Sequence, residues 1–68
     1  MRDDAVSAAV ERFVKKIGFE AQREIERVIR AAIAGGKLRS HDETLTTAVT
    51  VTNERLGLNT TIYSKIEL

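Results

Sequence analysis

Apolar residues recur at helical spacing between positions 21 and 33, and this feature constrains the fold more than any other. The set is Ala21, Ile25, Val28, Ile29, Ala32 and Ile33. On a helix of about 3.6 residues per turn they form one stripe, with charged side chains on the opposite side. Gly35 and Gly36 follow, where a glycine in the left-handed conformation ends many helices. The pattern predicts a helix over residues 20–34.

A second apolar stripe precedes the first. It consists of Ala5, Val6, Ala9, Val10, Phe13, Val14 and Ile17. Asp3 or Asp4 is placed to cap its start, and Gly18 is placed to stop it. The spacing therefore predicts a separate helix over residues 4–17, joined to the next by a link of about two residues. We expect Phe13 and Phe19 to lie in the core.

The last third of the chain has the alternation of β-strands. Residues 44–53 and 58–67 are rich in β-branched side chains and alternate between apolar and polar positions. The intervening NERLG segment is typical of a turn, with Gly57 at positive φ. The fold class predicted is α+β, with two N-terminal helices (4–17 and 20–34) packed on a C-terminal antiparallel hairpin. Residues 1–68 would form a single α-α-β-β domain.

The small size of the chain favours self-association. A chain of 68 residues has no room for a second core, and domains of this size are marginally stable without a staple. The sequence has no cysteine and one histidine, so disulfides and thiolate zinc sites are excluded. Either the core is unusually well packed or the chain forms a homodimer. A dimer that joins two hairpins into a four-stranded sheet would cover one strand edge per chain.

Charge and hydropathy limit the kinds of partner that the chain is expected to bind. Eleven basic and ten acidic side chains leave a net charge of +1, without the basic excess that binds nucleic acid or anionic lipid. No apolar run approaches the roughly 18 residues of a membrane span, and the first residues are acidic where a secretory signal is basic. We expect a cytoplasmic protein without cofactor, metal or membrane contact.

Five basic residues form the first candidate contact with nucleic acid or a protein partner. They are Arg23, Arg27, Arg30, Lys37 and Arg39. The three arginines share the polar side of the second predicted helix, which could act as a recognition helix with the hairpin as a wing. The neighbouring Glu20, Glu24 and Glu26 offset this charge. The alternative is a solvated face with the ion pairs Arg23–Glu26, Glu24–Arg27 and Glu26–Arg30.

The polar face of the hairpin is the second candidate contact. It carries Thr46, Thr50, Thr52, Thr61 and Tyr63. These residues could bind a protein partner, but threonine also suits a strand face exposed to solvent.

The loop SHDE at residues 40–43 contains the residue types of a hydrolytic triad. Neighbours in one loop do not give the converging geometry of a triad, and one imidazole beside carboxylates lacks the spread ligand set of a metal site. We therefore expect a solvated loop with local turn bonds.

Four short segments resemble a group of small bacterial proteins of about this length, known only as a domain of unknown function. These segments are QREIE at 22–26, AGGKL at 34–38, LGLN at 56–59 and the closing KIEL. The resemblance covers nearly the whole chain. It implies a bacterial cytoplasmic protein without an assigned activity, and it transfers no site residues.

These observations together favour a non-enzymatic protein-interaction module that self-associates through its sheet. A small DNA-binding regulator with a winged-helix-like arrangement is the alternative. An enzyme is least favoured, because the chain offers few catalytic groups and a small core.

Overall fold

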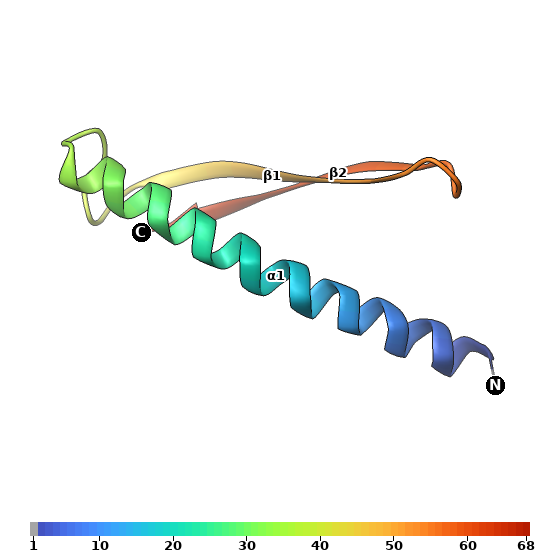
Figure 1. Cartoon of the computed structure of the whole chain (residues 1–68). Coiled ribbons are helices and arrows are strands. Elements are labelled where there is room, and N and C mark those ends of the chain that lie inside the picture. Colours follow the sequence, from blue (N-terminus) through green and yellow to red (C-terminus); the bar gives the residue numbers. More distant parts are fainter. Residues whose placement is uncertain (1) are drawn as a thin grey trace. The chain divides into compact units, whose positions relative to one another are not determined.

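The computed structural model describes residues 2–68, and side-chain environments from Asp4 onward. A single helix, α1 (Arg2–Ala34), is followed by strands β1 (Thr44–Asn53) and β2 (Leu58–Glu67), as Figure 1 shows. The chain divides into two compact units, Met1–Lys37 and Leu38–Leu68. The first holds the helix and the second holds the hairpin.

The α+β class is confirmed, but the prediction of two helices is wrong. α1 runs without interruption through Gly18 and Phe19. The glycines with positive φ are Gly36 and Gly57, so Gly18 does not adopt the conformation that would stop a helix.

The helix continues because stopping it would cost more than the glycine does. A glycine in a helix interior costs about 1 kcal/mol relative to alanine. A break would leave up to four N–H and four C=O groups without helical partners at the new ends. Lys15, Lys16, Glu20 and Gln22 are all good helix formers around Gly18, and the sequence has no proline to force a break.

The cap predicted at Asp4 is absent at the start of α1, whereas the glycine stop predicted at its end is present. The helix already includes Asp4, so Asp4 is a first-turn residue rather than a cap; the side chain of Asp3 lies outside the described residues. At the other end, Gly36 has a φ of 80°. The Lys37 N–H donates to the Ala32 carbonyl at 2.8 Å and the Gly36 N–H to that of Ile33 at 3.1 Å. These bonds form a Schellman motif, and the glycine stop is confirmed here.

β1 and β2 form a two-stranded antiparallel sheet with the predicted bounds. The register runs from Thr44 opposite Glu67 to Asn53 opposite Leu58. At the turn, the Leu56 N–H donates to the Asn53 side chain at 3.0 Å and the Gly57 N–H to the Glu54 carbonyl at 3.1 Å. Gly57 has a φ of 67°, which confirms the left-handed position predicted for it.

None of the described side chains is buried. Phe13 is 55% exposed and Phe19 is 63% exposed, so neither forms a core within the chain, contrary to expectation. The hydrophobic effect is the main favourable contribution to folding, and it requires apolar surface to leave water. Among the described residues, apolar side chains such as Val6, Phe13 and Ile62 remain more than half exposed to water.

We expect Gly18→Ala to stabilise the protein by about 1 kcal/mol per chain, because a Cβ at Gly18 meets no atom within 4 Å and alanine favours the helix. Thermal unfolding should shift upward by roughly 4–8 °C. Gly36→Ala is the matched control with the opposite sign, because the φ of 80° at Gly36 disfavours any side chain. A lower melting temperature for Gly18→Ala would contradict an open helix surface there.

Candidate interaction surfaces

The two predicted apolar stripes join into one surface along α1, which we call the helix stripe. Its central residues are Val6, Val10, Phe13, Ile17, Ala21, Ile25, Val28 and Ala32. Val14, Ile29 and Ile33 widen it. The sequence signal for this continuity was the spacing of four from Ile17 to Ala21 and again to Ile25. The prediction of a stop at Gly18 divided this surface in two.

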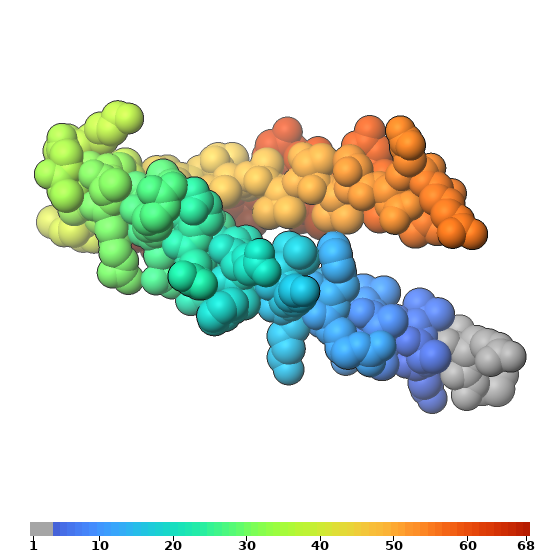
Figure 2. Space-filling view, viewed as in Figure 1, coloured from blue at the N-terminus to red at the C-terminus, as the bar shows by residue number. Residues whose placement is uncertain are grey.

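The N-terminal half of the helix stripe is open to solvent. Val6, Val10, Phe13 and Ile17 are between 44% and 60% exposed. In Figure 2 this blue half of α1 appears as a rod of atoms one helix thick. A continuous exposed apolar surface of this kind is typical of an interaction site.

Phe19 lies away from the helix stripe, although it is as exposed as Phe13. Six positions separate the two rings, which turns Phe19 toward the polar side of the helix. There the guanidinium of Arg23 lies 6.0 Å from the centre of the Phe19 ring, at the limit of a cation–π contact. Exposure alone therefore does not distinguish the two phenylalanines, but their positions on the helix do.

Two of the five basic candidate residues are paired with carboxylates on α1. Arg27 contacts Glu24 through two nitrogens, at 2.6 and 3.1 Å. Arg30 pairs with Glu26 at 3.2 Å, and Glu26 also accepts from Gln22 at 2.8 Å instead of pairing with Arg23.

The remaining basic candidates are divided between the two units. Arg39 lies 3.6 Å from Glu43, whereas Lys37 belongs to the helical unit. The structure thus places Arg23, Arg27 and Arg30 on one helix but does not bring all five residues into one patch.

The contact with Arg27 alters the titration of Glu24. The Arg27 guanidinium donates a hydrogen bond to the Glu24 carboxylate and adds its positive charge, which together lower the pKa of Glu24 below its ordinary value of 4.5. The same contact raises the pKa of Arg27. Because the folded pKa of Glu24 is depressed, the pair stabilises the fold above the unfolded pKa. This contribution is lost as pH falls through the folded pKa.

We expect Arg27→Ala to raise the pKa of Glu24 toward 4.5, because both causes of the depression are removed together. A side-chain carboxyl titration followed by NMR measures this. Arg30→Ala is the control, since Arg30 pairs with Glu26 and should leave Glu24 unchanged. An unchanged titration of Glu24 in Arg27→Ala would show that the pair does not persist in solution.

The hairpin has one apolar face and one threonine-rich face. The register places Leu45 opposite Ile66 and Val49 opposite Ile62 on the apolar face. The five residues of the polar candidate set share the other face: Thr46, Thr50, Thr52, Thr61 and Tyr63. On that face the hydroxyls of Thr50 and Thr61 lie 3.1 Å apart. All five are exposed, so the structure gathers them on one accessible surface.

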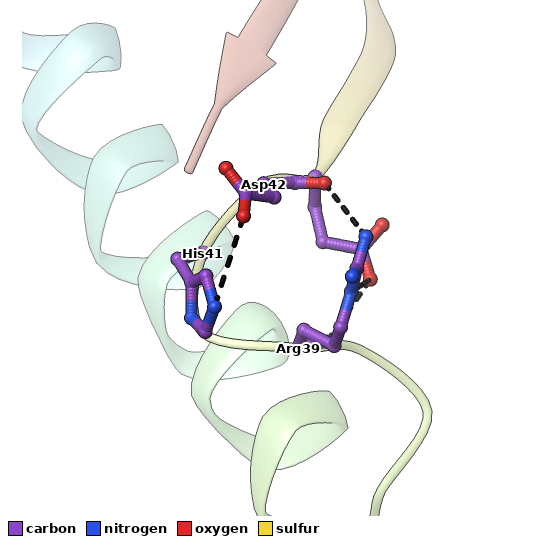
Figure 3. Close-up of polar contacts among 4 residues, drawn as sticks. Arg39, His41 and Asp42 are labelled. Carbon is purple, nitrogen blue, oxygen red and sulfur yellow. Dashed lines mark hydrogen bonds and ion pairs between the residues drawn. The ribbon is translucent and has the colours of Figure 1, made fainter.

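The loop before β1 is held by local bonds, as Figure 3 shows. Arg39 Nη2 donates to the Asp42 carbonyl at 3.0 Å, and the Arg39 N–H donates to the Glu43 carboxylate at 3.0 Å. His41 Nε2 lies 3.8 Å from Asp42 Oδ2, and both side chains are largely exposed. Asp42 adopts a φ of 59°, which Asp tolerates better than most residues. Ser40 forms no part of this network among the described contacts.

No group of three or more histidine and carboxylate side chains within the described residues is arranged to hold a metal ion. The candidate interaction surfaces of the described chain are the helix stripe, the arginine-bearing side of α1, the two faces of the hairpin and its strand edges.

Comparison with known proteins identifies the family. The model of a family of unknown function (DUF6494) matches residues 1–68, which is the whole chain. The chain therefore belongs to this family. No curated protein and no solved structure matches it. No helix in the described part of the chain combines the length and the apolarity needed to cross a membrane.

Proposed function

We propose that this member of the DUF6494 family is a non-enzymatic protein-interaction module that folds as a self-associated assembly. The observation that carries the proposal is the lack of any buried side chain among the described residues. A chain with 43% hydrophobic residues and no buried core has not yet removed its apolar surface from water. Association with another copy supplies the missing burial.

The helix stripe is longer than the strands of the hairpin. From Val6 to Ala32 it spans about 39 Å. Strands of 10 residues reach about 34 Å. A second copy of the same chain offers an apolar surface of the full length.

The hairpin offers a further route for association. Its sheet has two strands, so both are edges with unpaired backbone groups. Pairing of edges between copies would extend the sheet, and the same mode can add a strand from another protein. We propose that other proteins dock on the strand edges, by adding a strand to the sheet, and on the threonine-rich face.

DNA binding, the alternative, has less support. A winged helix-turn-helix needs at least two helices around its turn, and the described chain has one. Arg27, Arg30 and Arg39 are also paired with carboxylates, which reduces the positive field available to phosphates. We also propose a bacterial cytoplasmic protein, as the resemblance implies and as the hydropathy of the sequence led us to expect.

Sedimentation equilibrium tests the proposal directly. We expect the mass of a dimer or higher oligomer at micromolar concentration, and a helical circular-dichroism signal that falls with dilution, because dissociation and unfolding are linked. A monomer that stays folded across the dilution series would overturn it. A gel shift with generic duplex DNA at low salt tests the alternative.

A further inference from the structure

The spacing of the helix stripe reads the same in both directions. From Val6 to Ala32 the steps between its central residues are four, three, four, four, four, three and four. The centre of this pattern is position 19. If two copies lie antiparallel about a two-fold axis at that position, every central residue faces a central residue of the other copy. The facing positions are 6 and 32, 10 and 28, 13 and 25, and 17 and 21.

The sizes of the facing residues favour the antiparallel direction. Ile17 faces Ala21, and Val6 faces Ala32, so large side chains meet small ones and can interdigitate. A parallel pair in register would instead place each residue against its own copy. Phe13 would then crowd Phe13, while two Ala21 residues would leave a gap, and both faults are destabilising.

The charges beside the helix stripe favour the same direction. Lys16, Glu20 and Glu24 follow one edge of the stripe at spacings of four. A two-fold axis perpendicular to antiparallel helices brings like edges together, so Lys16 of each copy lies between the two acids of the other. In a parallel pair, the edge with Lys16, Glu20 and Glu24 would lie against the other edge of the partner's stripe. That edge carries Gly18 and Gln22, which offer no positive charge to pair with the two glutamates.

The repeat also sets how the helices cross. Seven steps cover the 26 residues from Val6 to Ala32, about 3.7 residues per turn. This is slightly longer than the natural period of the helix, so the stripe drifts in the direction that favours a right-handed crossing rather than a left-handed coiled coil.

We propose that two copies of this chain pair through their helix stripes as antiparallel helices, with the two-fold axis at residue 19. This inference rests on the proposed self-association and specifies its surface and direction. The paired segment from Val6 to Ala32 is about 39 Å long. The C-terminal ends of the two helices, from which each chain continues to its hairpin, then lie at opposite ends of the helix pair.

Disulfide trapping in the full-length protein tests the direction, because the natural chain has no cysteine. Val10→Cys and Val28→Cys are made singly, and one of them is labelled with ¹⁵N so that mass spectrometry separates mixed from identical pairs. After mixing, exchange and mild oxidation, we expect mixed disulfides to dominate. Each variant alone should not link, because identical positions lie about 27 Å apart in the antiparallel pair, far beyond disulfide reach. Arg12→Cys, on the polar side, gives the background from random collisions.

The outcomes distinguish a failure of antiparallel helix pairing from a failure of self-association. Efficient linking of Val10→Cys to itself, without mixed pairs, would show a parallel pair and overturn the direction while leaving self-association intact. Linking no better than Arg12→Cys, in a protein that sediments as a dimer, would overturn the helix stripe as the interface. A folded monomer in sedimentation would overturn both.

Discussion

Replacement of Phe13 by aspartate is expected to abolish self-association and to remove most of the helical signal. Phe13 is the largest of the central residues of the helix stripe, and the proposed pair buries it against Ile25 of the other copy. Loss of a buried phenylalanine costs about 3–5 kcal/mol, and a dimer loses it twice. The dissociation constant should therefore rise by more than about 10,000-fold. Sedimentation equilibrium and circular dichroism at the same concentrations measure both effects.

Phe19→Asp is the matched control for this variant. The two rings are 55% and 63% exposed, so the chain alone gives no reason for different effects. Only the helix stripe distinguishes them, since Phe19 lies on the polar side beside Arg23. We expect Phe19→Asp to change stability by about 1 kcal/mol at most, through the lost ring contact and a lower helix propensity. Equal loss of association in both variants would mean that the stripe is not the interface.

The hairpin could be predicted from the sequence because its signals are local and agree with one another. Alternation over residues 44–53 and 58–67 fixes the face of every side chain, since a slip by one residue would exchange the two faces. Gly57 gives the turn its positive φ, and Asn53 caps it with a side-chain oxygen. Each of these choices depends only on residues close in the chain.

The unbroken helix was not predicted, because Gly18 and Gly36 are both glycines that follow an apolar stripe. Gly36 follows the last stripe residue and adopts a φ of 80°, whereas Gly18 lies between Ile17 and Ala21 in an unbroken stripe. A glycine stops a helix only when the loss of the following turns is compensated elsewhere. Here the helix stripe continues past Gly18, so an unbroken helix presents a longer surface for association.

The candidate surfaces show the same limit. Local ion pairs such as Glu24–Arg27 and Glu26–Arg30 follow from spacing and are present. The contact expected between Arg23 and Glu26 is replaced by one from Gln22, which spacing alone does not decide. The missing core was also not predictable, because apolar periodicity shows which residues seek burial but not whether the covering surface belongs to the same chain.

Replacement of Ile62 by lysine is expected to destabilise the hairpin and its assembly. Ile62 faces Val49 across the strands and is 58% exposed in the chain, on the apolar face that we expect the assembly to cover. Loss of this burial and of the cross-strand pair should cost about 2–3 kcal/mol per chain, or a fall of roughly 10–20 °C in melting temperature.

Tyr63→Lys tests the opposite face with the same new side chain one residue away. Tyr63 is 71% exposed and faces Ala48 among the threonines. Lysine is common on exposed strand edges, so this variant should lose less than about 1 kcal/mol and keep the mass of the wild-type assembly. If Tyr63→Lys instead dissociated the assembly while Ile62→Lys left it intact, the threonine-rich face would be the surface between copies. The apolar face would then remain for another partner. Because both variants carry the same charge on the same strand, the difference between them reports only which face is covered.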